Sequence, residues 1–122
     1  MKKIILVILL LSSSSALAEW IYLTQNKLGS SFIDFKGIKK NGSHRKAWTF
    51  IVFNEKQQES VLSMKTYDEY DCANDETRNL SMIIYSDKEG MNIINRFDKT
   101  GNFTAAIPSS TSETALKAIC KY

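Results

Sequence analysis

His44 is the first side chain to consider for chemistry, because it is the only histidine in the sequence. A general base needs a nucleophile or an orienting carboxylate within hydrogen-bond reach. His44 instead follows the turn-forming segment 40–43, so we expect a histidine in a surface loop. The sequence has no Ser-His-Asp order, glycine-rich phosphate loop or metal-spaced histidine pair. An enzyme centred on His44 is therefore the weakest hypothesis, and we expect neither an enzyme nor a cofactor.

Two stretches carry oxygen ligands that a divalent cation would accept. The first is an acidic cluster around Cys72, and the second contains Asp98, Thr100 and Asn102. The spacing of the cluster matches no calcium loop, and the second stretch has Ser109 where a closing glutamate would stand. We expect no metal site, and we interpret the cluster as a charged surface at the end of a strand; its members are Asp68, Glu69, Asp71, Asp75 and Glu76.

A basic segment surrounds the pair Asn41 and Gly42, which favours a tight hairpin turn. Its candidate ligand-binding residues are Lys39, Lys40, Arg45 and Lys46. Such a group would bind a sulfated glycan, an anionic lipid headgroup or an acidic protein surface. The other interpretation, which we favour on sequence grounds, is a solvated turn whose lysines protect an exposed strand edge.

Cys72 and Cys120 are the only cysteines. A redox pair is usually a close C-x-x-C, and a metal site needs further ligands near each cysteine. In an exported chain of this size, an even cysteine count most often means a disulfide, and we predict one here. Closing a loop of about 48 residues would stabilise the fold by about 4 kcal/mol.

The amino terminus has the pattern of an export signal. Lys2 and Lys3 precede an apolar run at 4–11, and the small-x-small triplet 16–18 follows a serine tract. The run is too short to span a bilayer, which takes about 20 apolar residues. We predict cleavage between Ala18 and Glu19 and a periplasmic or secreted chain without a transmembrane segment. The signal contains no cysteine for lipidation.

Residues 19–122 form a single predicted domain in which strands alternate with turns before one helix. We expect strands over 20–24, 31–35, 46–53, 59–70, 78–86 and 91–97. Ser110 and Glu113 form a capping box, and Ala115, Leu116, Ile119 and Cys120 share one face of the helix that follows. Without the lysines of the signal, the formal charge of +3 falls, so nucleic acid is not an expected partner.

The segment 46–53 is apolar on both faces and is therefore expected near the middle of a sheet, covered on both sides. One helix covers one face only. The other face must meet a curled sheet, a second subunit or a ligand.

An ordered set of short motifs resembles the bacterial surface-adhesin protein E family. The set spans nearly all of residues 19–122 and consists of Phe32, Ile33 and Asp34; Gly37 and Ile38; Trp48; Ser63 and Lys65; residues 67–72; residues 107–110; and Ala115, Leu116, Ile119 and Cys120. The resemblance implies an α+β fold: an antiparallel sheet of about six strands with one C-terminal helix, and a disulfide between Cys72 and Cys120. It also implies homodimers that bind host extracellular-matrix or serum proteins.

Two functional hypotheses follow. The first is a small exported, non-enzymatic binding protein of the adhesin E type, with a host or envelope protein as its partner and the basic hairpin or a sheet face as its site. The second is a periplasmic inhibitor of a hydrolase such as lysozyme, in which Asp87 or Glu89 enters the catalytic cleft.

Overall fold

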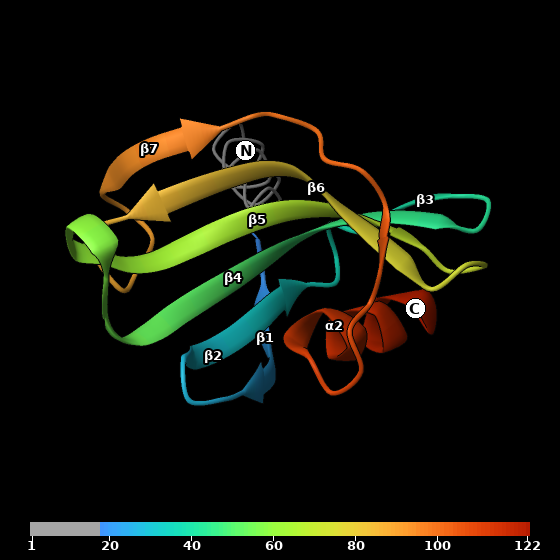
Figure 1. Ribbon diagram of the computed structural model, residues 1–122, viewed down its shortest axis with the longest axis horizontal. Coiled ribbons are helices and arrows are strands. Elements are labelled where there is room, and N and C mark those ends of the chain that lie inside the picture. Colours follow the sequence, from blue (N-terminus) through green and yellow to red (C-terminus); the bar gives the residue numbers. More distant parts are fainter. Residues whose placement is uncertain (1–17) are drawn as a thin grey trace, which may run out of the picture.

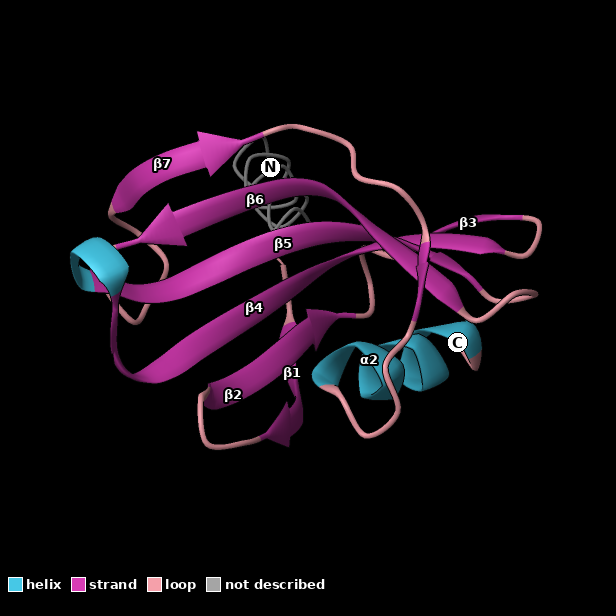
Figure 2. Ribbon diagram, in the orientation of Figure 1, coloured by secondary structure: helices cyan, strands magenta, loops and turns pink. Residues whose placement is uncertain are grey.

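A twisted antiparallel sheet and one helix make up the computed structural model, which describes residues 18–122 (Figures 1 and 2). Residues 1–17 of the predicted signal segment 1–18 lie outside the described residues. Six strands follow the order β1-β2-β4-β5-β6-β7. Their bounds are β1 Trp20–Gln25, β2 Gly29–Asp34, β4 His44–Gln57, β5 Val61–Asp71, β6 Glu76–Tyr85 and β7 Ile93–Phe97. The predicted fold class and all six predicted strands are confirmed.

Two short strands were not predicted. β3 (Lys39–Asn41) pairs with the start of β4, and β8 (Thr104–Ala105) pairs with the start of β6. Gly42 has a φ of 61° in the turn between β3 and β4, as the Asn-Gly pair predicts. A one-turn helix, η1 (Gln58–Ser60), links β4 to β5. Sequence patterns miss β3 because its residues are all exposed and carry no hydrophobic alternation.

The C-terminal helix α2 (Thr111–Cys120) starts as its capping box predicts. The Ser110 hydroxyl accepts a hydrogen bond from the Glu113 amide at 3.2 Å, and the Glu113 carboxylate accepts one from the Ser109 amide at 3.1 Å. One N–H group of the first helical turn and one just before the helix are thereby satisfied. No helix within residues 18–122 is long and apolar enough to cross a membrane.

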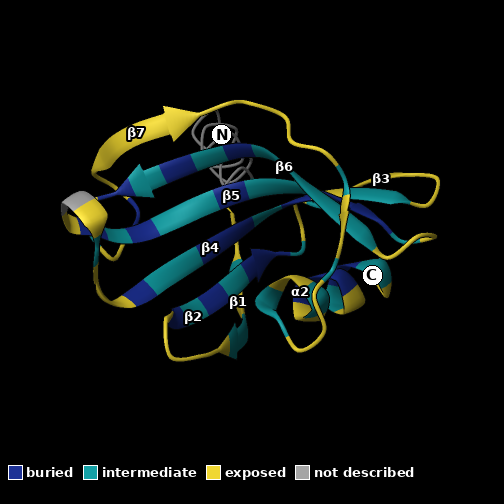
Figure 3. Cartoon of the chain, in the orientation of Figure 1, coloured by how far each residue is buried: buried dark blue, intermediate teal, exposed yellow. Residues whose placement is uncertain are grey.

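The main core lies between α2 and one face of the sheet. Ala115, Leu116 and Ile119 of the helix are buried there, as the sequence predicts. They form one cluster with buried side chains of β2, β4 and β5, namely Ile33, Ala47 and Tyr70. In Figure 1, α2 lies across one end of the sheet only, so the other end of this face has no helix over it. Figure 3 shows buried and half-buried residues along β4, β5 and β6, whereas β7 is exposed throughout.

Aromatic rings cover part of the opposite face. The Phe50 ring lies 5.3 Å from that of Trp20 and 6.1 Å from that of Phe32. The Lys65 ammonium lies 5.5 Å from the Phe50 ring and donates to the Gly90 carbonyl oxygen at 3.2 Å. Phe50 is consequently only 8% exposed. A curled sheet, a second subunit or a ligand was expected to cover this face. At Phe50 the curled sheet itself does so, together with the loop at Gly90.

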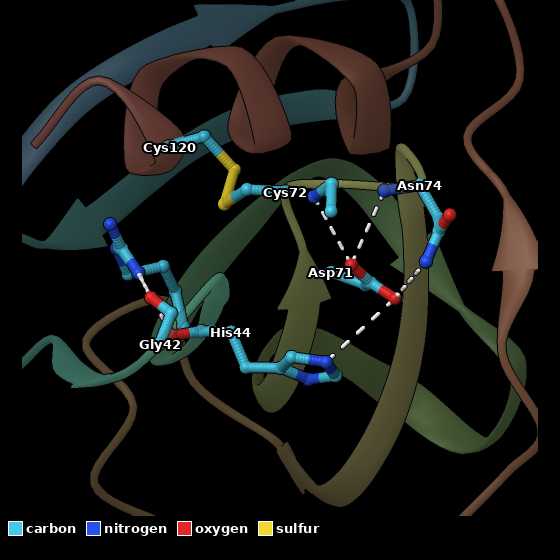
Figure 4. The surroundings of a disulfide bond; sticks show 8 residues. Gly42, His44, Asp71, Cys72, Asn74 and Cys120 are labelled. Carbon is cyan, nitrogen blue, oxygen red and sulfur yellow. Dashed lines mark hydrogen bonds and ion pairs between the residues drawn. A yellow bond between two sulfur atoms is a disulfide. The ribbon is translucent and has the colours of Figure 1, made fainter.

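The predicted disulfide between Cys72 and Cys120 is confirmed, with a Cα–Cα distance of 5.7 Å (Figure 4). It joins the last residue of α2 to the turn after β5. The Cys72 amide also donates to the Ser43 carbonyl oxygen at 2.9 Å. The helix, β5 and the β3–β4 hairpin are thus tied together at one end of the sheet.

Replacing both Cys72 and Cys120 with serine should lower the free energy of unfolding by about 4 kcal/mol, because the unfolded chain loses a cross-link that spans 48 positions. Urea unfolding of the purified protein measures the change. Wild-type protein treated with reductant is the matched control and should unfold at the same urea concentration as the double variant. An unchanged midpoint in both samples would contradict a stabilising role for the disulfide.

Candidate functional site

The β3–β4 hairpin brings the four predicted basic residues together but divides them between its two faces. Lys39 pairs with Lys46, and Lys40 pairs with Arg45. Residues directly opposite each other in an antiparallel pair point to the same face. The Lys39–Lys46 pair and the Lys40–Arg45 pair therefore point in opposite directions.

Lys39 and Lys46 are exposed and share their face with His44. A hollow of about 620 Å³ lies here, lined by residues of the hairpin and by Glu69 of β5. Its other lining residues include Lys40, Asn41, Gly42 and Ser43. The hollow is wide and polar, so it suits part of a macromolecular surface better than an enclosed small ligand.

Lys40 and Arg45 are engaged within the protein. The Lys40 ammonium donates to the carbonyl oxygen of Tyr122 at 2.6 Å and lies 5.3 Å from the centre of its ring. The Arg45 guanidinium donates to the carbonyl oxygens of Gly42 at 2.8 Å and His44 at 3.0 Å. Arg45 is half-buried and stabilises the turn through these two hydrogen bonds. Of the predicted site, Lys39 and Lys46 are the residues best placed to meet a partner.

The expectation of a surface-loop histidine is wrong for His44. It is the first residue of β4, and its Nδ1 lies 2.8 Å from the Glu69 carboxylate. Its Nε2 lies 3.7 Å from the Asp71 carboxylate. Both carboxylates come from β5, twenty-five or more positions along the chain, so only the pairing of β4 with β5 places them beside the imidazole.

Glu69 is the centre of an ion-pair network on this face. Arg78 of β6 donates to its carboxylate from Nε at 2.9 Å and from Nη2 at 2.7 Å. The Phe103 ring lies 4.4 Å from the Arg78 guanidinium and 5.7 Å from the His44 ring. Sequence reasoning missed Arg78 and Phe103, because neither carries a motif. No hydrogen bond within residues 18–122 joins His44 to a hydroxyl or thiol, so the arrangement is electrostatic and shows no activated nucleophile.

The acidic cluster predicted as one charged surface is instead divided by the strand. Glu69 and Asp71 point to the His44 face, whereas Asp68 points to the face that carries α2. Asp71 accepts hydrogen bonds from the side chain of Asn74 at 2.8 Å and from the Ala73 amide at 3.1 Å, which lower the pKa of its carboxyl group (Figure 4). The carboxylates of Asp68, Glu69 and Asp71 are thus engaged by side chains and amides of the strands and the turn. No group of three metal-ligating side chains occurs in the part of the chain that the structure describes.

Further acidic residues singled out in the sequence lie in or beside the β6–β7 connection and after β7, and two of them form hydrogen bonds there. The Asp87 carboxylate accepts from the backbone amides of Met91 at 3.0 Å and Asn92 at 2.9 Å, and so closes the β6–β7 turn. Glu89 is exposed on that turn. The Asp98 carboxylate accepts from the Ser81 hydroxyl at 2.6 Å and pairs with Arg96.

Opposing effects set the pKa of Glu69. Burial raises it, but hydrogen bonds from Arg78 and His44, together with the charges of Arg78 and Lys46, hold the pKa below the usual value of 4.5. The folded state thus binds this proton less readily than the unfolded state. The resulting stabilisation is present above pH 4.5 and is lost as the pH falls through the lower pKa of the folded protein.

Glu69→Gln should therefore flatten the decrease in unfolding free energy below pH 4.5 and destabilise the protein at neutral pH, where Arg78 loses its charged partner. Urea unfolding between pH 3 and pH 7 measures both effects. Glu55→Gln, at an exposed position of β4, is the control and should keep the wild-type pH dependence. Identical pH profiles for Glu69→Gln and the wild type would show that the network does not stabilise the fold.

Comparisons with known proteins agree with this architecture. The sequence model of the surface-adhesin protein E family matches residues 20–121. Crystal form II of Haemophilus influenzae protein E is similar in structure, with a TM-score of 0.66 and 16% identity over 88% of this chain and 91% of that one. Protein E from non-typeable Haemophilus influenzae gives a TM-score of 0.61 and 17% identity over 88% and 79%. No match is found among curated protein sequences.

The structural likeness establishes a shared fold, and the sequence model covers all the strands and the helix described above. The family resemblance predicted from the sequence motifs is confirmed. The chain belongs to the surface-adhesin protein E family.

Proposed function

We propose that this protein is an exported, non-enzymatic binding protein that holds an acidic protein surface with the β3–β4 hairpin. The partner is an extracellular-matrix or serum protein of a host, or an envelope protein of the producing cell. Membership of an adhesin family supports a binding role. The observation that carries the proposal is the exposed Lys39–Lys46 pair.

Lys39 and Lys46 lie directly opposite each other, an arrangement of like charges that destabilises a strand pair. Lys46 also lies opposite Glu69 of β5, whose carboxylate attracts it. Glu69 is shared with Arg78 and His44, however, and the hairpin pairing places no acid opposite Lys39. The two ammonium groups thus leave a positive surface beside the hollow, which attracts acidic partners.

We also propose that the protein works outside the cytoplasm, after export by the signal and cleavage between Ala18 and Glu19. The Cys72–Cys120 bond supports an oxidising compartment, because disulfides persist there. Homodimerisation remains a prediction from the family resemblance. The inhibitor hypothesis has less support, because the Asp87 carboxylate closes its own loop.

Reversing both charges with Lys39→Glu and Lys46→Glu should weaken binding to immobilised heparin and to extracellular-matrix proteins by about tenfold or more, because like charges then face the acidic partner. Surface plasmon resonance at low and high salt measures the loss. Lys27→Glu with Lys56→Glu, at two other exposed lysines, is the control with the same change in net charge.

The single change Lys39→Glu separates lost binding from misfolding, because it creates an opposite-charge pair with Lys46 and should not destabilise the hairpin. Equal losses in the Lys39/Lys46 and Lys27/Lys56 variants would mean that only net charge matters, and the hairpin would not be the site. Inhibition of lysozyme by the wild-type protein would favour the inhibitor hypothesis instead.

A further inference from the structure

A cleft remains on the helix-bearing face of the sheet, next to the start of α2. It has a volume of about 260 Å³ and a floor of half-buried apolar side chains: Ile51, Met64 and Met82. Thr111, Ser112 and Ala115 of α2 form one wall. The cleft exists because α2 covers only one end of this face, as Figure 1 shows. It lies on the opposite side of the sheet from the His44 network.

Asp68 lies at the polar end of this cleft. Its carboxylate accepts a hydrogen bond from the Thr66 hydroxyl at 2.8 Å and one from the Asn79 side-chain amide at 2.9 Å. Asn79 is itself held by the Ser81 carbonyl oxygen at 3.0 Å. A second hollow, of about 350 Å³, also has Asp68 and Asn79 in its lining. The carboxylate is therefore fixed in place where two surface hollows meet.

Asp68 differs from Glu69 in having no cationic partner. Every ion pair of Glu69 and Asp71 lies on the other face, and no Lys, Arg or His within residues 18–122 forms an ion pair with Asp68. Its two donors are neutral. At the start of α2, the Glu113 amide donates to the Ser110 hydroxyl rather than to Asp68. A desolvated carboxylate held only by neutral donors gains most from an added cation.

Two further hydroxyl groups lie in the same cleft. Thr49 and Tyr70 both line it, are 4% and 3% exposed, and the Thr49 hydroxyl lies beside that of Tyr70. A hydroxyl oxygen has two acceptor lone pairs, so this contact leaves the Thr49 oxygen able to accept another hydrogen bond. Burial also raises the pKa of Asp68 above its usual value, although the hydrogen bonds from Asn79 and Thr66 oppose the shift. Perturbed acids in clefts are often functional.

We infer that this cleft binds the cationic end of a lysine or arginine side chain of a partner protein, with Asp68 as the counter-ion. The aliphatic stem of such a side chain matches the floor of Met64, Met82 and Ile51. The Thr49 hydroxyl, which lies beside that of Tyr70, keeps a lone pair that can accept a hydrogen bond from the same cation. This site is independent of the hairpin and would give the protein a second, oppositely charged contact.

Capped tripeptides Ac-Gly-Lys-Gly-NH₂ and Ac-Gly-Arg-Gly-NH₂ provide the test, with the norleucine tripeptide as a probe that keeps the stem and lacks the charge. Amide chemical shifts of the ¹⁵N-labelled protein report binding. The cationic peptides should shift the amides of Asp68, Asn79 and Ser112. Asp68→Asn should weaken their binding by about tenfold or more, since charged hydrogen bonds are the stronger ones.

Asp68→Asn keeps the shape of the side chain, and it should not lower the melting temperature at pH 7, because it removes a desolvated charge. Glu55→Gln, at an exposed position of β4, should leave peptide binding unchanged. Tighter binding of putrescine than of the lysine peptide would support the site and identify a free diamine as the source of the cation. Equal binding of the norleucine peptide, unchanged binding by Asp68→Asn, or no shifts up to the solubility limit would each overturn the inference.

Discussion

The Cys72–Cys120 disulfide holds the end of α2 at the turn after β5, and the position of the helix on the sheet depends on it. A helix of ten residues is about 15 Å long, too short to cover the whole face once its end is fixed. It buries Ile33, Ala47 and Tyr70 and leaves the cleft at Asp68 uncovered. The same turn also binds the β3–β4 hairpin, because the Cys72 amide donates a hydrogen bond to the Ser43 carbonyl oxygen. One covalent link therefore sets the surroundings of both proposed sites.

Strand alternation determines the charge pattern of β5. Asp68, Glu69 and Asp71 are neighbours in sequence, yet the pleat sends Asp68 to one face and the other two to the opposite face. Arg78 and His44 meet Glu69 because β4 and β6 flank β5 on both sides. Within residues 18–122, the Asp68 carboxylate accepts hydrogen bonds only from Thr66 and Asn79. Acids that look equivalent in the sequence thus have cationic partners on one face and only neutral donors on the other.

The sequence allowed prediction of the features that local chemistry governs. Runs of β-prone or alternating apolar residues predicted the six main strands, the Asn41–Gly42 pair predicted the hairpin, and Ser110 with Glu113 predicted the start of α2. The environment of His44 was not predictable, because it depends on the register between β4 and β5 rather than on nearby residues. The basic hairpin was identified correctly, but which pairs share a face followed only from its register.

Lys65 limits which molecules can stack on the aromatic side chains that cover the sheet face opposite α2. Its ammonium lies within 5.8 Å of the ring centres of Trp20, Phe50 and Tyr85 and has one hydrogen-bond acceptor, the Gly90 carbonyl oxygen. A flat apolar surface placed over these rings would strip water from the ammonium without replacing it. Only a molecule that brings an acceptor to this point avoids that penalty. The charge of Lys65 therefore disfavours non-specific association through this aromatic surface.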